Sequence, residues 1–190
     1  MIALPSDVLA QLNDSRDPEV TQWALPDTEL VSLLEALGRA LSSSDLDGVV
    51  ANSRIAFALG DAISYPKTVA EAQSLTSRNT AIVQRLERGD PVFGQVVSDL
   101  SRSTNRLVSI SAYVSEVHSK AFSWHVDKWD NLVIQAQGRK AFEIEGGVTK
   151  ELGPGDALFL PEDIQHRPRT IDKSVHLSVA FFPSGHSTSA

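Results

Sequence analysis

The chain has 190 residues, enough for one domain with a sizeable hydrophobic core, and its formal net charge is −7. We do not expect such a chain to bind nucleic acid, because phosphate neutralisation needs clustered Lys and Arg and no such run is present. Cysteine is absent, which excludes disulfides, thiolate nucleophiles and cysteine-ligated zinc. There is neither an apolar run of roughly 18 residues nor a signal-peptide pattern, so we expect a cytoplasmic protein with no membrane partner.

Helical signals dominate the first half of the sequence. Residues 1–26 are weakly patterned and suggest only a short amphipathic turn. Leucine then recurs at helical spacing after the capping residue Asp27, which predicts a helix over 27–41 that packs on the core. The next predicted elements are short strands over 49–59, a helix near 69–75 after the capping box of Thr68 and Glu71, a strand over 80–86, and a helix that starts at Asp90-Pro91.

From Arg106 onward the helical spacing disappears and short β-rich runs alternate with turn residues. These runs cover 107–114, 131–137, 140–145, 156–161, 166–171 and 175–182. Such a series is typical of a β-sandwich or barrel. We therefore expect an α+β, mainly β fold in a single domain over 1–190. Its parts are a helical and strand lead-in over 1–105, a β core over 106–183 and a flexible polar tail over 184–190.

His125 and Asp127 form the first candidate ligand pair. Residues two apart in an extended segment point to the same side, so an imidazole and a carboxylate are presented together. His166 follows a Gly-Pro turn and a strand that ends at Pro161, and an antiparallel barrel could bring it beside the pair. Two histidines and one carboxylate are the ligand set of non-haem Fe(II) oxygenases. The ordinary alternatives are a surface His near an Asp for the pair and a hydrogen-bonded core histidine for His166.

Lys140 is the candidate anion-binding residue. It follows Gly138-Arg139 at the start of a strand, where Phe142 and Ile144 share its side of the chain. This parity favours an inward lysine. A buried cation is costly unless it meets an anion, and the carboxylate of a cosubstrate would satisfy it. The alternative is a lysine that points outward into solvent, as most lysines do.

The last predicted strand has one apolar and one polar side. Val175, Leu177 and Val179 share the first side, and His176 and Ser178 share the second. The polar side could line a polar cavity or face solvent, and periodicity favours neither reading.

Several of these motifs resemble the JmjC-type, cupin-fold Fe(II)/2-oxoglutarate-dependent oxygenases, in their ribosomal-oxygenase-like (cupin-4) branch. The resemblance lies in the segment from His125 through Gln135 to Lys140, and in the Gly155-Asp156 to Leu160-Pro161 run that leads to His166. It extends over about residues 78–182 and is weaker over 26–77. The fold that it implies is a double-stranded β-helix (jelly-roll or cupin) core with N-terminal helices packed on it.

The resemblance also implies roles for individual residues. His125, Asp127 and His166 would be the Fe(II) ligands and the catalytic centre, and Lys140 would bind the far carboxylate of 2-oxoglutarate. Tyr113, twelve residues before the first ligand, and Ser178, where Thr is common, would help to hold the cosubstrate. The implied cofactors are therefore Fe(II), 2-oxoglutarate and O2.

The substrate side is the least defined part of the sequence. Residues 128–131 depart from the usual family pattern, so the substrate rim could differ. The residues that we predict to face the substrate are Trp124, Trp129, Asn131, Gln135 and His176, with barrel packing as the alternative for the two tryptophans. His118 and His186 are predicted to be surface residues.

Two classes of function remain from the sequence. The first is a 2-oxoglutarate-dependent dioxygenase that hydroxylates an amino-acid side chain (free, carrier-bound or in a peptide) or a small metabolite. The second is a non-catalytic cupin-like module or sensor that holds a metal or a small acid. A cupin enzyme that works without 2-oxoglutarate is a third option, which the combined His125, Asp127, His166 and Lys140 set disfavours. The 27–41 helix or an exposed barrel edge could also pair two chains into a homodimer.

Overall fold

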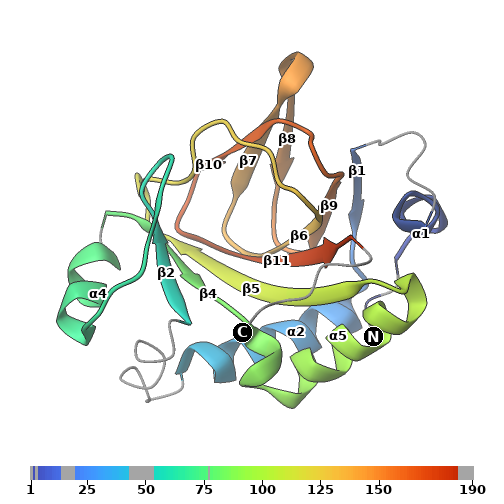
Figure 1. Ribbon diagram of the computed structural model, residues 1–190, viewed down its shortest axis with the longest axis horizontal. Coiled ribbons are helices and arrows are strands. Elements are labelled where there is room, and N and C mark those ends of the chain that lie inside the picture. Colours follow the sequence, from blue (N-terminus) through green and yellow to red (C-terminus); the bar gives the residue numbers. More distant parts are fainter. Residues whose placement is uncertain (1, 3, 14–19, 43–53, 77, 184–190) are drawn as a thin grey trace.

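The computed structural model shows two β-sheets that face each other, with helices covering the outer side of the larger sheet (Figure 1). It describes residues 2, 4–13, 20–42, 54–76 and 78–183. The sheets are antiparallel throughout the strand pairs of the described chain. This arrangement confirms the predicted α+β, mainly β fold with a jelly-roll core and helices packed on it.

The helices come mainly from the first half of the chain. They are α1 (Ser6–Asn13), α2 (Asp27–Ser42), α4 (Val69–Thr76) and α5 (Pro91–Thr104), with a short 3-10 turn over Leu86–Arg88. In Figure 1, α2 and α5 lie side by side beneath the larger sheet. Their buried apolar residues join those of the sheet above them in one core. None of the described helices is long and apolar enough to cross a membrane.

The strands form one large and one small sheet. The large sheet contains β1 (Thr21–Ala24), β2 (Ile55–Ala58), β3 (Ile63–Ser64), β4 (Thr80–Val83), β5 (Leu107–Ser115), β6 (Asp130–Gln137), β9 (Asp156–Leu160) and β11 (Ser174–Phe182), in the order β1-β9-β6-β11-β5-β4-β2-β3. The small sheet contains β7 (Lys140–Ile144), β8 (Val148–Leu152) and β10 (His166–Thr170), in the order β10-β7-β8.

Local sequence signals explain where two of the helices begin. The Asp90 carboxylate accepts the Val92 N–H at 2.9 Å, and Pro91 stands in the first turn of α5, as predicted. Arg39 of α2 binds the same carboxylate at 2.8 Å, which ties the two helices together. Before α4, the Thr68 hydroxyl accepts the Glu71 N–H at 3.2 Å.

The first half also holds elements that the sequence pattern did not reveal. Residues 6–13 form a full helix rather than a single turn, and β1 pairs with β9 at the edge of the large sheet. The predicted strand over 80–86 ends at Val83, because Arg85 adopts a left-handed backbone with φ 57°. Strand β8 was missed because most of its residues are exposed and polar. Residues 49–53 and the predicted tail 184–190 lie outside the described residues.

A tight turn between β6 and β7 fixes the start of β7. Gly138 has φ +65°, and a Cβ there would lie 2.0 Å from the carbonyl oxygen of Lys173. Only glycine fits this approach between the turn and the start of β11. The turn delivers Lys140 directly into the space between the sheets, where its side chain is 1% exposed.

Candidate functional site

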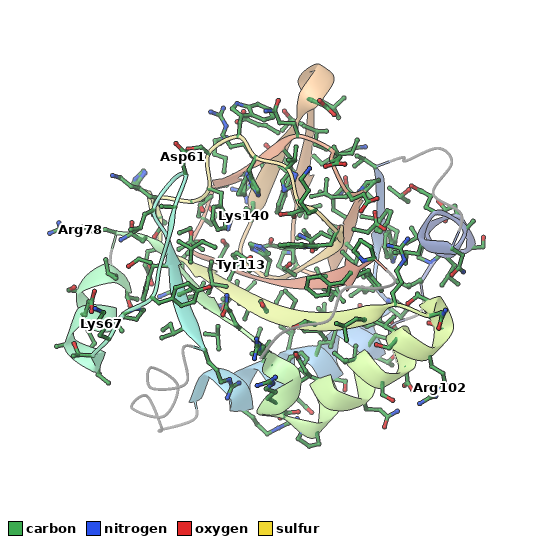
Figure 2. All side chains as sticks on the ribbon, in the orientation of Figure 1. Asp61, Lys67, Arg78, Arg102, Tyr113 and Lys140 are labelled. Carbon is green, nitrogen blue, oxygen red and sulfur yellow. The ribbon has the colours of Figure 1, made fainter. Side chains whose placement is uncertain are left out.

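A cavity of about 460 Å³ lies between the two sheets. The large sheet contributes side chains from β5, β6 and β11, and the small sheet contributes side chains from β7 and β10. The β2–β3 hairpin lies at its open end. Figure 2 shows Tyr113 and Lys140 inside the barrel and Asp61 at the tip of this hairpin. The cavity therefore has a closed end within the barrel and a mouth formed by loops.

His125 and His166 link the two sides of the cavity through their backbones. The N–H of His125 donates to the carbonyl of His166 at 3.0 Å, and the N–H of His166 donates back at 2.9 Å. Their rings consequently lie close, with centroids 4.3 Å apart. The backbone alone thus holds side by side two histidines that are 41 positions apart in the sequence.

In both rings, Nε2 is the nitrogen that can bind a metal ion. Nδ1 of His125 lies 2.8 Å from the Ser123 carbonyl, and Nδ1 of His166 lies 3.0 Å from the Ile164 carbonyl. A carbonyl oxygen only accepts hydrogen bonds, so Nδ1 must carry the proton in each ring. The lone pair of each ring then resides on Nε2. Burial lowers the pKa of His166, which favours the neutral ring that binds metals.

The Asp127 carboxylate completes the group. Ligand atoms of His125, Asp127 and His166 all lie within 4.8 Å of one another, and Nε2 of His166 is 3.9 Å from Oδ2 of Asp127. The Asn131 amide donates to the same carboxylate oxygen at 3.3 Å. Ser178 in turn donates its hydroxyl to Oδ1 of Asn131 at 2.8 Å. This chain of hydrogen bonds orients the carboxylate from β6 and β11.

The closed end holds a buried cation that has no carboxylate partner among the described residues. Nζ of Lys140 donates to the Ser115 hydroxyl at 3.0 Å and lies 3.4 Å from Nδ1 of His176. The Ser115 hydroxyl is also 2.9 Å from that of Thr80, so this end is polar but uncharged apart from Lys140. Burial lowers the pKa of Lys140 to about 7, because nothing there compensates the ammonium charge.

Aromatic rings form the walls between the closed end and the three ligands. Tyr113 stacks on His176 with ring centroids 4.8 Å apart, and the Phe142 ring meets His176 edge-on at 5.9 Å. Phe142 also lies 6.5 Å from the His166 ring, so it stands between the closed end and the ligand group. Burial raises the pKa of Tyr113, and the Asp127 charge adds to this effect, so its hydroxyl remains protonated and can donate a hydrogen bond.

The mouth is more exposed and is made by segments that are not core strands. Trp124 is 40% exposed there, and the Arg167 guanidinium lies 5.2 Å from its ring. Arg167 is itself paired with Glu143 of β7. The Ser123 N–H donates to the Gly60 carbonyl at 3.4 Å, which joins the β2–β3 hairpin to the segment that leads to His125.

The structure brings together nearly all the side chains that the sequence pointed to. The cavity is lined by Tyr113, Trp124, His125, Asp127, Trp129, Asn131, Lys140, His166, His176 and Ser178. The polar side of β11 thus faces the cavity rather than solvent, while Val175, Leu177 and Val179 join the main core. The exposed position of His118 agrees with the prediction, and His186 lies outside the described residues.

Gln135 requires a correction, because it is fully buried but is not among the residues that line the cavity. Its amide donates to the carbonyls of Gln137 and Gly138, at 2.8 and 3.2 Å, and so braces the β6–β7 turn. Gln135 shares the parity of Asn131 and pairs with His176, but it stands at the end of β6 next to the turn. The side chain is therefore used to satisfy backbone carbonyls at the turn.

Sequence reasoning also missed several cavity residues. Thr80 and the hairpin residues Ala58, Gly60, Asp61 and Ile63 come from the lead-in, far from the motifs. Ser115, which accepts from Lys140 but is not itself part of the cavity lining, had a usable signal, since it stands two positions after Tyr113 on the same strand and so shares its face.

The fold and the site define a class. An antiparallel jelly-roll encloses a cavity with two Nδ1-protonated histidines and a carboxylate at one level, and a buried lysine deeper inside. This is a cupin-type double-stranded β-helix with a two-histidine, one-carboxylate group of the kind found in non-haem iron proteins.

Comparison with known proteins narrows the class. The model of the JmjC domain family matches residues 93–152, which include His125, Asp127 and Lys140. Solved structures of YcfD, a ribosomal oxygenase from Escherichia coli, have the same fold. The complex with cobalt and succinic acid and the complex with cobalt and 2-oxoglutarate each give a TM-score of 0.66 at 17% identity. The chain thus has the fold of this ribosomal oxygenase and a match to the JmjC domain over part of its length.

The coverage of these matches is unequal. The two YcfD structures align with 99% of this chain but with only 54% of their own, so this chain spans about half the length of the protein that it resembles. A further structure of the same oxygenase gives a TM-score of 0.64 at 18% identity. No curated protein matches the chain in sequence.

The residues present fit both a metal ion and a dicarboxylate. The three candidate ligands offer two imidazole nitrogens and a carboxylate oxygen that already converge. The buried Lys140 has no carboxylate partner among the described residues, and a carboxylate entering the cavity would stabilise its charged form. A metal and an acid could thus be held at two levels of one cavity.

Proposed function

We propose that this chain is an Fe(II)- and 2-oxoglutarate-dependent oxygenase that hydroxylates an amino-acid side chain (free, carrier-bound or in a peptide) or a small metabolite. One observation carries the proposal. The cavity that gathers His125, Asp127 and His166 also contains the buried Lys140, which has no carboxylate partner in the described chain. A metal-binding module without cosubstrate would have no use for this costly cation.

In this proposal, His125, Asp127 and His166 hold Fe(II), and Lys140 binds the far carboxylate of 2-oxoglutarate. Bound Fe(II), with 2-oxoglutarate and O2, supplies the oxidising chemistry for hydroxylation. The chain supplies position. Asn131 orients the Asp127 carboxylate, and the two backbone carbonyls keep each histidine in its metal-binding tautomer.

The remaining lining residues have two tasks. Tyr113, whose hydroxyl stays protonated and which lines the same cavity, would donate a hydrogen bond to an acid beside Lys140. The apolar walls formed by Val133, Phe142 and Phe122 exclude water from the space between the acid and the ligands. The substrate then approaches through the mouth beside Trp124.

The test is turnover of 2-oxoglutarate by the full chain with Fe(II), ascorbate and a library of peptides and metabolites. We expect succinate to form, with an increase in one library member equal in mass to an oxygen atom. If the protein binds metal and 2-oxoglutarate but forms no succinate with any library member, the non-catalytic binding module replaces this proposal. Turnover that needs no 2-oxoglutarate would instead support another type of cupin enzyme.

A further inference from the structure

The closed end of the cavity contains a second nitrogen base beside Lys140. His176 is 4% exposed, and its Nδ1 lies 3.4 Å from Nζ of Lys140. Both side chains line the same cavity, although they come from different sheets. At this separation, a single carboxylate oxygen can accept hydrogen bonds from both nitrogens at ordinary distances.

We propose that His176 is a second binding residue for the far carboxylate of 2-oxoglutarate, and that its imidazole takes up a proton from solvent when the carboxylate arrives between it and Lys140. This inference rests on the proposed function. It adds to that function a second donor to the far carboxylate, beside Lys140.

The surroundings of His176 show why the ring is neutral before the acid binds. The titratable groups packed against it are Lys140 from β7 and Tyr113 from β5, and Phe142 covers its edge. None of these offers a negative charge near neutral pH. Burial and the adjacent Lys140 lower the pKa of His176 well below its ordinary value. The neutral ring then accepts a hydrogen bond from the ammonium.

A bound carboxylate reverses this balance. Its negative charge favours protonation of the imidazole, and Nδ1 changes from acceptor to donor. The ring is already held in place, because it stacks on Tyr113 at an interplanar angle of 13°. The proton comes from solvent and stays on the imidazole while the acid is bound. Two charge-assisted hydrogen bonds then hold the carboxylate instead of one.

The two bases are expected to act in different pH ranges. The pKa of Lys140 is lowered to about 7, so below pH 7 this residue is already mostly charged. Proton uptake on binding in that range must therefore come mainly from His176. Above pH 7, Lys140 adds its own proton uptake, because an anion raises its pKa again.

The experiment is calorimetric titration of 2-oxoglutarate into the Mn(II)-loaded full chain, in buffers with different heats of ionisation. At pH 6.5 we expect the wild type to take up about one proton for each 2-oxoglutarate bound. His176→Asn should lose most of this uptake and bind roughly ten- to a hundredfold more weakly. His118→Asn is the matched control, because this exposed residue has φ 67°, a conformation that Asn tolerates.

The outcomes separate this inference from the function on which it rests. Tight binding without proton uptake by the wild type at pH 6.5 would overturn the role of His176 and leave the oxygenase proposal intact. Unchanged proton uptake by His176→Asn would do the same. If the metal-loaded wild type does not bind 2-oxoglutarate, the proposed function fails and this inference fails with it. The wild-type measurement decides even if the variant does not fold.

Discussion

The two ends of the cavity are built in different ways. The closed end consists of buried side chains on core strands, Lys140 of β7, Ser115 of β5 and His176 of β11. The mouth consists of the β2–β3 hairpin and the segment that carries Trp124, both more exposed. Under the proposed function, the core strands would hold the metal and the acid, which any such reaction needs, and the exposed segments would determine which substrate binds.

The largest expected effect on activity comes from the three candidate metal ligands, His125, Asp127 and His166. Asp127→Ala removes one of the three converging ligands and should abolish both metal binding and turnover of 2-oxoglutarate. Metal affinity measured by Mn(II) titration checks this. Asp99→Ala, which removes a carboxylate of α5 that accepts from Gln95 and is absent from the cavity lining, should leave both unchanged. Normal turnover by Asp127→Ala would remove Asp127 from the ligand set.

At the closed end, Lys140→Met should weaken 2-oxoglutarate binding on the order of a hundredfold, because the acid would lose its main counter-charge. Metal binding should be nearly unaffected, since Lys140 makes no contact with the ligands among the interactions of the described residues. Lys120→Met, at an exposed lysine, is the control. Equal affinity in both variants would show that the acid binds elsewhere.

The buried ammonium of Lys140 should also make the folding stability of the ligand-free protein depend on pH. Burial depresses the pKa of Lys140 from 10.5 to about 7. Between these values the unfolded chain holds a proton that the folded chain has lost, so stability rises with pH across this window. Lys140→Met lacks this term and should be the more stable protein below pH 7, by on the order of a few kcal/mol. Denaturant titrations at pH 6 and pH 9.5 should show this gap closing at the higher pH.

Asn131→Ala tests whether the hydrogen bond to Asp127 orients this candidate metal ligand. The variant loses the amide that donates to Asp127, so metal affinity should fall about tenfold. Ser178→Ala keeps this amide and removes only the hydroxyl that binds Asn131, so its loss should be smaller. Metal titrations of the two variants give the comparison, and the reverse order would contradict this hydrogen-bond chain.

The smallest effect is expected at the mouth. Arg167→Ala frees the Trp124 ring and should raise KM for the substrate a few-fold without changing 2-oxoglutarate affinity. Arg169→Ala is a close control, because Arg169 also pairs with Glu143 but makes no contact with Trp124 among the described interactions. A change in 2-oxoglutarate affinity in the Arg167 variant would mean that the two ends are not independent.

The sequence could predict the parts of the site that depend on local alternation, but not those that depend on which side of a strand faces the core. Alternation pairs His125 with Asp127, and parity with Phe142 favours an inward Lys140, so each of these side chains could be foreseen separately. The resemblance to a known family is what predicted that they share one cavity. The orientation of His176 and Ser178 could not be foreseen. These residues face the cavity because the apolar side of β11 packs in the core that the helices cover. A local pattern cannot reveal which side of a strand that core will occupy.

Residues of the lead-in were the hardest to foresee. The β2–β3 hairpin reaches the cavity because β2 pairs with β4, and β4 pairs with β5. Such pairings join distant segments and have no signature in a single short strand. Gln135 shows the opposite problem, since its alternation was clear but its amide is used by the backbone carbonyls of the adjacent turn.

The reciprocal backbone hydrogen bonds between His125 and His166 have a consequence for metal uptake. They set the separation of the two histidines from the main chain, and the carbonyls at Ser123 and Ile164 restrict the rotation of each ring. An arriving ion therefore orders little that is not already ordered, and the entropy lost on binding is small. We therefore expect a higher metal affinity here than three ligands on mobile segments would give.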